Sequence, residues 1–303
     1  MKTAAVIFLT KLKMKSINDI LTIIENHLDE KIIAKSGVGG GCISNALQLT
    51  TSSGKKYFAK INNSAPKDMF SKEANGLLEL SKASVIKVPS VIFCDESFIL
   101  LEYIEPASEA NNFFEDFGRK FAMLHQHRAA EFGFFEDNYI GSTRQANTAS
   151  VEEKNDWIKF YFNKRILFQY KLAEKNGFAT SELRNGISML ENKIEEILLS
   201  EDKFPSLLHG DLWSGNFIIG EDGKVCLIDP AVYYGSREAD LAMTKLFGGF
   251  PAAFYKAYNE YFPLSPGFEY RENLYKLYHV LNHLNLFGSS YYSQAISLLN
   301  FYF

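Results

Sequence analysis

The chain of 303 residues is poor in cysteine, in long apolar runs and in excess charge of either sign. Its three cysteines do not indicate a disulfide framework, so a reducing cytoplasm is the simplest setting. A net charge of −4 argues against a nucleic-acid-binding protein, which needs a basic face. The apolar run at residues 4–9 is too short to span a membrane, so we expect no membrane partner.

What is present describes an ordinary globular protein. Hydrophobic residues make up 47% and charged residues 22% of the chain, and its length allows two lobes. We find no internal repeats and no low-complexity tracts. Residues 1–15 are assigned to an N-terminal extension. Residues 1–13, which carry lysines around the short apolar run, are interpreted as part of this extension or as an additional strand.

The most informative stretch is Leu207 to Tyr233, which reads LLHGDLWSGNFIIGEDGKVCLIDPAVY. Two short apolar runs flank a Gly-Glu-Asp-Gly turn signal, which predicts a β-hairpin. Asn216 precedes the first strand of this hairpin, and Asp229 follows the second. Because a hairpin folds back on itself, we expect Asn216 and Asp229 to lie close together.

The chemistry of this stretch is that of phosphoryl transfer. Asn216 and Asp229 offer oxygen ligands of the kind that Mg²⁺ accepts, and Asp211 precedes them on a loop where it can take a proton. The spacing matches the constellation of protein-kinase-like enzymes. The alternative is a solvated loop with turn-forming Asp and Asn residues, which requires the spacing and the second Asp to be accidental.

A glycine-rich loop containing Gly39, Gly40 and Gly41 precedes two predicted strands, residues 46–50 and 56–61. Because a strand follows this loop, it is neither a Rossmann fingerprint nor a Walker loop, which are both followed by a helix. It suits a loop that covers the phosphates of ATP, although Cys42 replaces the third glycine of the kinase pattern.

Lys60 ends the strand that follows this loop, where kinases place a lysine that reaches the phosphates. Residues 70–82 predict a helix that supplies its glutamate partner, Glu73 or, as the alternative, Glu79. A surface lysine is the competing interpretation of Lys60.

Residues 98–103 form an apolar run where a hinge between two lobes is expected. Backbone groups of Glu102 and Ile104 are candidates for binding adenine, and a buried central strand is the plainer interpretation. The remainder is mainly helical: we predict helices at residues 113–130, 157–172, 182–199, 239–247, 252–262 and 272–287, and a loop at 138–150.

The predicted fold is therefore α+β and bilobal, of the protein-kinase-like type. Residues 16–104 form a small N-lobe with an antiparallel sheet, and residues 105–303 form a larger, mostly helical C-lobe. His279 and His283 could bind zinc, but without an evident third ligand we interpret them as buried polar residues. An acidic cluster between residues 105 and 116 is interpreted as a solvated face.

The motif His209-Gly210-Asp211-Leu212-Trp213-Ser214-Gly215-Asn216 resembles the catalytic loop of the fructosamine kinase, or ketosamine 3-kinase, family. Other stretches are also similar, among them residues 228–235, 237–243 and 277–288. The resemblance extends over residues 17–303. His-Gly-Asp-x4-Asn alone marks the wider group that includes aminoglycoside and choline kinases, whereas the Leu-Trp-Ser-Gly filling is more specific.

The resemblance implies ATP-dependent phosphorylation of the 3-hydroxyl of a ketoamine, free or protein-linked, which starts deglycation. By position Asp211 would be the catalytic base, Asn216 and Asp229 the Mg²⁺ ligands, and Lys60 with Glu73 the phosphate-binding pair. Trp213 would help to form the sugar site. The preferred sugar stays open.

The resemblance also suggests a redox role for Cys42, with a monomer or a disulfide-linked homodimer as the resulting states. The alternative for Cys42 is a tolerated small residue. Two other functions compete with the ketoamine kinase: a kinase of an aminoglycoside, choline or homoserine, and a catalytically inactive pseudokinase that acts as a binding module. A pseudokinase is expected to lack the base, a metal ligand or the lysine, and all of these are present.

Overall fold

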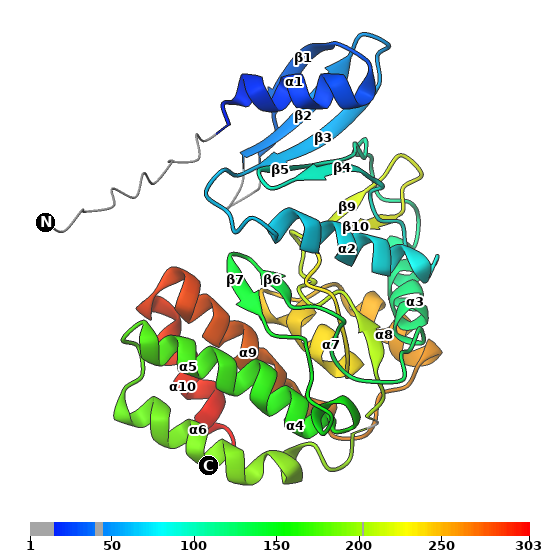
Figure 1. Cartoon of the computed structure of the whole chain (residues 1–303). Helices are drawn as coiled ribbons and strands as arrows, with labels where there is room; N and C mark the ends of the chain where they lie inside the picture. The colour runs from blue at the N-terminus through cyan, green and yellow to red at the C-terminus, as the bar shows by residue number, and fades with distance from the viewer. Residues whose placement is uncertain (1–14, 40–44, 202) are drawn as a thin grey trace, which may run out of the picture.

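The computed structural model describes residues 15–39, 45–201 and 203–303. An antiparallel sheet of five strands lies at one end of the molecule and a mostly helical body at the other (Figure 1). The strand order in this sheet is β1-β2-β3-β5-β4. Its strands are β1 (Ile32–Gly37), β2 (Asn45–Thr51), β3 (Lys56–Ile61), β4 (Val91–Asp95) and β5 (Phe98–Glu102). The two strands predicted around residue 54 are confirmed as β2 and β3.

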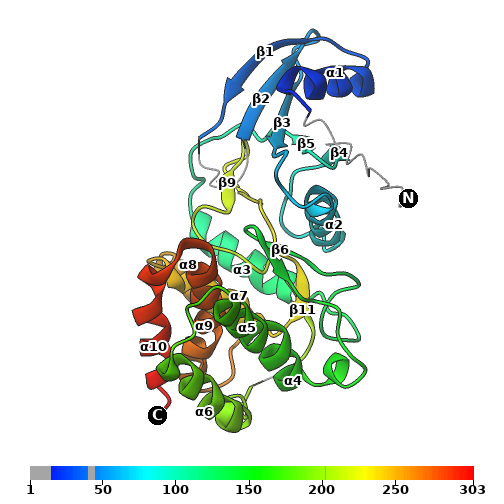
Figure 2. The same ribbon diagram turned by 60° about the vertical axis from the view of Figure 1, so that its left-hand side comes forward.

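Two helices accompany this sheet. Helix α1 (Ile17–Leu28) begins at Ser16, which forms a capping box with Asp19, and buries Ile20 and Ile24 in the core of the N-lobe. Helix α2 (Met69–Lys82) lies between the sheet and the helical body (Figures 1 and 2). Its apolar side packs against strand β5, as expected from its helical periodicity.

The C-lobe consists of helices, helical turns and short strand pairs. The α-helices are α3 (Phe113–His125), α4 (Trp157–Tyr161), α5 (Phe168–Lys175), α6 (Ser181–Ile197), α7 (Arg237–Leu246), α8 (Ala252–Tyr261), α9 (Phe268–Phe287) and α10 (Tyr292–Asn300). The helical turns are η1 (Glu153–Asn155), the π-helical η2 (Phe162–Leu167) and η3 (Ser289–Tyr291). The paired strands are β6 (Asn138–Ile140) with β7 (Thr143–Gln145), β8 (Ser206–Leu208) with β11 (Tyr233–Gly235), and β9 (Phe217–Ile219) with β10 (Val225–Leu227).

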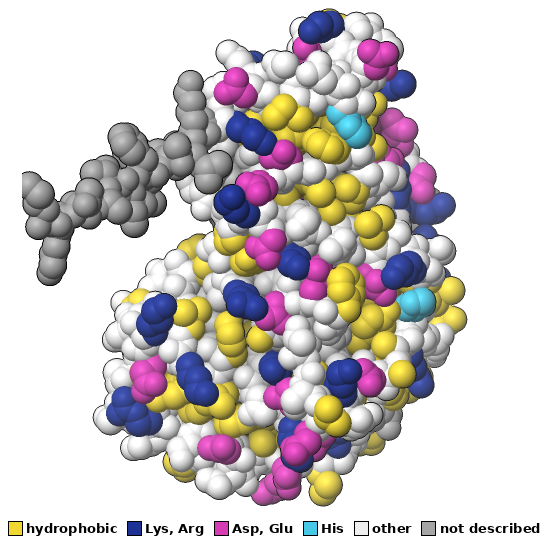
Figure 3. All heavy atoms as spheres, in the orientation of Figure 1, with side chains coloured by type: hydrophobic (Ala, Val, Ile, Leu, Met, Phe, Trp, Pro, Cys, Tyr) yellow, Lys and Arg dark blue, Asp and Glu magenta, His cyan; other side chains and the backbone are white. Residues whose placement is uncertain are grey.

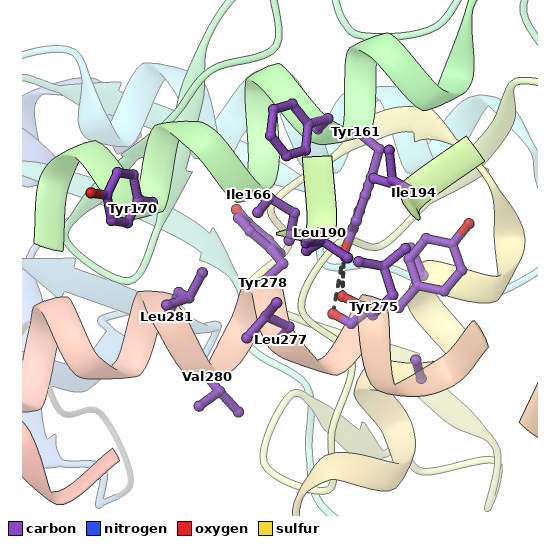
Figure 4. Packing of buried hydrophobic residues seen from close by; sticks show 14 of the residues in the cluster. Tyr161, Ile166, Tyr170, Leu190, Ile194, Tyr275, Leu277, Tyr278, Val280 and Leu281 are labelled. Atoms are coloured by element: carbon purple, nitrogen blue, oxygen red, sulfur yellow. Dashed lines mark hydrogen bonds between the residues drawn. The ribbon is translucent and has the colours of Figure 1, made fainter. Parts of the chain in front are cut away.

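Aromatic and aliphatic side chains of α4, α6 and α9 form the larger core of the C-lobe (Figure 4). Tyr161 is fully buried there, and its hydroxyl donates to the backbone carbonyl of Tyr275 at 3.3 Å (Figure 4). This hydrogen bond satisfies the polar end of a core tyrosine, as buried tyrosines require. The core therefore fixes α9 against the helices that precede the catalytic stretch.

Two predictions about this lobe are wrong. The segment at residues 138–150 is not an irregular loop but contains the β6–β7 hairpin. The amides of Asn138 and Gln145 are buried there and donate to the backbone carbonyls of Val232 and Ala231. Helix α3 ends at His125 rather than near residue 130, because the chain then pairs with the segment before β8: Leu207 N–H donates to His127 O at 2.8 Å.

Within the described part of the chain, the helices are too short or too polar to cross a membrane. On the face shown in Figure 3, acidic and basic side chains are mixed rather than separated into patches. Such a mixed surface is typical of a protein in contact with water on that face.

Candidate active site

The β9–β10 hairpin brings the two predicted metal ligands together. Strand β10 pairs antiparallel with β9, with Leu227 opposite Phe217. Just beyond this pair, Ile228 N–H donates to Asn216 O at 3.1 Å. Asp229 therefore starts next to Asn216, and the predicted return of the hairpin is confirmed.

Asp211 lies beside Asn216. The Asn216 Nδ2 donates to the carbonyl oxygen of Asp211 at 2.7 Å and to its Oδ2 at 3.2 Å. Because the amide nitrogen is used in this way, the amide oxygen of Asn216 would be the atom that binds a cation. Burial raises the pKa of Asp211 well above its usual value, and the nearby charge of Asp229 raises it further. Such a concentration of carboxylate charge favours a bound cation.

Lys60 reaches this group from the other lobe. Its Nζ lies 2.5 Å from Glu73 Oε1 and 2.5 Å from Asp229 Oδ1. Glu79, the alternative partner, instead accepts hydrogen bonds from Lys82 and from the Tyr234 hydroxyl. Burial alone would lower the pKa of Lys60, but the charges of Asp229 and Glu73 outweigh it and raise that pKa. Lys60 is thus held as a cation between two carboxylates.

The backbone of the catalytic loop is held closely against the segment after Asp229. Gly210 has φ +84°, and a Cβ there would lie 2.0 Å from the carbonyl oxygen of Ala231. Ala231 N–H donates to His209 O at 2.9 Å across the same contact. Asp229 itself adopts φ 54°, a left-handed conformation that is unusual for a residue other than glycine. Unfavourable backbone conformations of this kind concentrate at functional sites.

Asp240 binds the backbone of the loop that contains His209 and Gly210. It was not among the predicted site residues. Its carboxylate accepts the N–H of His209 at 2.7 Å and that of Gly210 at 2.8 Å. His125 contributes a third contact at 3.3 Å and is buried, consistent with its prediction as a packing residue. Asp240 lies within the stretch 237–243, and an acidic residue on the apolar side of a predicted helix was the available signal.

The residues predicted to bind the nucleotide lie only partly within the described structure. Gly39 is described, and a Cβ there would meet no described atom within 4 Å, whereas Gly40, Gly41 and Cys42 lie outside the described residues. At the predicted hinge, Glu102 N–H donates to Ser90 O at 2.9 Å, so this N–H already has a partner within the chain. Ile104 is buried next to Gly220 of the β9–β10 hairpin.

An exposed aromatic surface begins beside Asp211. Trp213, 36% exposed, packs edge-on against Phe247 at 5.8 Å between ring centroids. Phe247 in turn contacts His283 at 5.1 Å. The sequence interpretation missed Phe247 and treated His283 only as a buried polar residue. Among the residues that the structure describes, no three His, Cys, Asp or Glu side chains gather as metal ligands, at the His279–His283 pair or elsewhere.

The sequence profile of the fructosamine kinase family matches residues 16–302. The chain belongs to the fructosamine kinase family. This family member is 39% identical to a Vibrio parahaemolyticus protein named "probable ketoamine kinase" over 277 residues, which cover 89% of this chain and 92% of the relative. It is 40% identical to a chloroplastic protein-ribulosamine 3-kinase of Arabidopsis thaliana over 281 residues, with coverage of 89% and 83%.

A solved structure from Thermobifida fusca, assigned as a fructosamine-3-kinase, shares the fold of this family member. The TM-score is 0.83 at 29% identity, and the match covers 94% of this chain and 99% of the other. The predicted fold class, α+β and bilobal with a protein-kinase-like architecture, is thereby confirmed. The boundaries predicted for the extension and the two lobes stay predictions.

Proposed function

We propose that this family member is an ATP-dependent kinase that phosphorylates the 3-hydroxyl of ketoamines of the fructosamine or ribulosamine type. The observation that carries the proposal is the convergence of Asp211, Asn216 and Asp229 with Lys60 at one point between the lobes. The names of the ketoamine kinase and ribulosamine kinase relatives support the substrate class.

Asp211 is the proposed catalytic base. It orients the sugar hydroxyl and accepts its proton as the phosphoryl group is transferred, a step in which positioning matters more than basicity. Trp213 lies two residues along the loop and offers its ring as a wall of the sugar site.

Asn216 and Asp229 fit as ligands of Mg²⁺. Their side chains supply one amide oxygen and one carboxylate, and Mg²⁺ is usually held by one or two carboxylates together with substrate phosphates and water. When bound, the ion would neutralise charge on the transferring phosphoryl group. A site completed by phosphates agrees with the lack of a three-residue metal cluster among the described residues.

The remaining roles concern ATP. Lys60, held by Glu73, is proposed to bind the phosphates, and the loop with Gly39, Gly40 and Gly41 to cover them. Adenine is proposed to contact the hinge through the carbonyl of Glu102 and backbone groups of Ile104. The charges of Asp229 and Glu73 outweigh the effect of burial on the pKa of Lys60 and keep it a cation, which suits a phosphate ligand.

We further propose that the reaction starts deglycation and takes place in the cytoplasm. The low cysteine count of the chain supports a reducing setting. Burial raises the pKa of Cys226 to about 12, so this thiol is a poor nucleophile. Cys42 stays the candidate for a redox switch between a monomer and a disulfide-linked homodimer.

The regiochemistry of the product tests the proposal. Incubation of a ribulosamine adduct of lysine with ATP and Mg²⁺, followed by ¹³C and ³¹P NMR, is expected to place the phosphate on the 3-oxygen of the sugar. Phosphate on another hydroxyl would refute the 3-kinase assignment while leaving a sugar kinase. Absence of any phosphorylated product would refute the ketoamine kinase altogether.

A further inference from the structure

One face of helix α2 carries a row of polar side chains that point away from the sheet. They are Asp68, Lys72, Asn75 and Glu79, at spacings that place them on the same side of a helix. Each contacts a residue of the C-lobe. Glu73, which holds Lys60, belongs to the same helix, so the position of this helix decides where the Lys60 amine lies.

The centre of this row is bound by a single carboxylate, that of Glu136. Lys72 Nζ lies 2.7 Å from Glu136 Oε2, and Asn75 Nδ2 donates to its Oε1 at 2.8 Å. The side chains of Lys72 and Glu136 are 21% and 15% exposed. Such partial burial makes the pair stronger and more specific than an ion pair in open solvent.

Two further hydrogen bonds hold the ends of the row. The Tyr139 hydroxyl donates to Asp68 Oδ1 at 2.7 Å, at the start of the helix. Near the other end of the helix, the Tyr234 hydroxyl donates to Glu79 Oε1 at 2.8 Å. The helix is therefore attached along its length rather than at one point.

The segment that binds α2 also binds the backbone that follows Asp229. Asn138 Nδ2 donates to Val232 O at 2.7 Å, and Gln145 Nε2 donates to Ala231 O at 2.9 Å. Both amides belong to the β6–β7 hairpin, which lies between α2 and the C-lobe helices in Figures 1 and 2. One hairpin and its leading residues thus contact the two elements that carry Glu73 and Asp229.

The helix lies close to the same backbone. A Cβ on Gly76 of α2 would lie 3.4 Å from Val232 Cγ2 and 3.5 Å from Pro230 Cγ. Any rotation of α2 would thus have to break the Glu136 contacts and also alter this packing. Contacts that exist only in the observed position of α2, such as those of Glu136, favour this position over a rotated one.

We propose that Glu136 is a positioning residue that holds α2 so that Glu73 and Lys60 stay in register with Asp229. This inference depends on the proposed kinase function for its kinetic consequence. Its structural consequence, a helix α2 held by Glu136, can be measured without substrate. The competing interpretation is that Glu136 contributes only to general stability.

The variant Glu136→Gln removes the charge and retains a hydrogen-bond acceptor. It is expected to lower kcat for a ketoamine about tenfold, with little change in KM for the ketoamine, because the sugar site is built from other residues. The charge swap Lys72→Glu with Glu136→Lys restores the pair in reverse and is expected to recover most of kcat. Loss of kcat in a Glu136→Gln protein that is fully folded, together with its recovery in the double variant, distinguishes positioning from general stability.

A matched control is available within the C-lobe. Lys164 Nζ lies 3.2 Å from Glu153 Oε2, and Asn163 Nδ2 donates to Glu153 Oε1 at 3.0 Å, with the side chains of Lys164 and Glu153 25% and 9% exposed. Glu153→Gln removes an ion pair of similar burial that does not connect the lobes, and wild-type kcat is expected. Equal losses of kcat in Glu153→Gln and Glu136→Gln would contradict the proposal, as would a double variant no more active than either single one.

Hydrogen exchange on the complete protein provides the second measurement. In Glu136→Gln we expect peptides of α2 to exchange several-fold faster than in wild type, while peptides of α6 are unchanged. Unchanged exchange in α2 would overturn the proposal. If Glu136→Gln does not fold, Lys72→Gln replaces it, because it removes the charged partner of Glu136: faster α2 exchange supports the proposal, and wild-type exchange with wild-type kcat overturns it. A wild-type protein inactive on ketoamines would refute the proposed function, and the exchange comparison would still decide the role of Glu136.

Discussion

Lys60 and Asp229 form an ion pair of 2.5 Å across the two lobes, although they are 169 residues apart in the sequence. Glu73 lies at the same distance from the Lys60 amine on the side of the N-lobe. One amine is therefore shared by two carboxylates with different proposed tasks. Binding of ATP with Mg²⁺ at this point would require Asp229 to exchange part of its contact with Lys60 for the ion.

Replacement of Lys60 tests its role in binding phosphate. We expect Lys60→Met to lower kcat by at least about a hundredfold, since loss of one preorganised cationic donor removes much of the stabilisation of transition-state charge. Initial rates at saturating ATP give the answer. Lys56→Met is the control, because Lys56 lies on the same strand with an exposed ion pair to Glu105. Activity of Lys60→Met within threefold of wild type would refute the proposed role of Lys60 in binding phosphate.

Asp211→Asn tests the catalytic base. The substitution keeps the size of the side chain and removes its ability to accept a proton, so we expect turnover to fall by roughly a thousandfold. Binding of ATP, measured by calorimetry, is expected to persist because the proposed phosphate ligands are unchanged. Asp222→Asn, in the exposed turn of the β9–β10 hairpin, is expected to behave as wild type. Near-normal turnover in Asp211→Asn would be incompatible with the proposed mechanism.

Gly210→Ala tests the close approach of the catalytic loop to Ala231. A methyl group there meets the Ala231 carbonyl at 2.0 Å, in addition to the unfavourable φ of +84°. Gly177 has a similar φ of +80°, but a methyl group at that position would meet nothing within 4 Å among the described residues. Gly177→Ala is therefore expected to lower the free energy of unfolding by only about 1–2 kcal/mol, because alanine is unfavourable in a left-handed conformation. Chemical denaturation should show a larger loss for Gly210→Ala, and equal losses would contradict the steric argument.

Glu201 predicts a pH dependence of stability that is separate from catalysis. Burial, aided by the charge of Glu238, raises the pKa of Glu201 to about 8 in the folded protein, where the Tyr275 hydroxyl contacts its carboxylate at 2.6 Å. The folded state thus keeps a proton that the unfolded state, with a pKa of 4.5, has lost. The contribution of Glu201 to the free energy of unfolding is therefore fully present below pH 4.5, and it declines as the pH rises toward 8.

The variant Glu201→Gln imitates the protonated acid and should remove this dependence. Between pH 5 and 8 we expect the free energy of unfolding of wild type to fall by at least ~1 kcal/mol relative to the variant, as measured in urea. A constant difference between the two proteins over this range would show that Glu201 does not titrate as proposed. Kinase activity at a fixed pH serves as a check that the variant is folded.

Local patterns were sufficient to predict part of the architecture. The helix start at Ser16, the β2–β3 turn and the return of Asp229 to Asn216 all depend on residues close together in the sequence. The preference for Glu73 over Glu79 as the partner of Lys60 is confirmed by their 2.5 Å contact. The sequence left Glu79 open as an alternative because both residues lie on one helix.

The missed residues have distant partners. Glu136 binds residues 64 and 61 positions away, and Asp240 binds the loop 31 and 30 positions away, so no local pattern indicates either contact. The polar residues around Asn138 and Gln145 suggested a loop, because their partners are also distant in the sequence. These amides are buried because they bind backbone carbonyls of the segment after Asp229, a contact that exists only when the chain is folded.

The most direct test of the proposed function is the consumption of ATP with a panel of acceptors. The panel contains ribulosamine and fructosamine adducts of lysine together with kanamycin, choline and homoserine, and Asp211→Asn is the blank. We predict turnover of the ketoamines alone, and their relative rates would identify the preferred sugar. Turnover of kanamycin, choline or homoserine without turnover of the ketoamines would contradict the account and leave only a kinase of another small molecule.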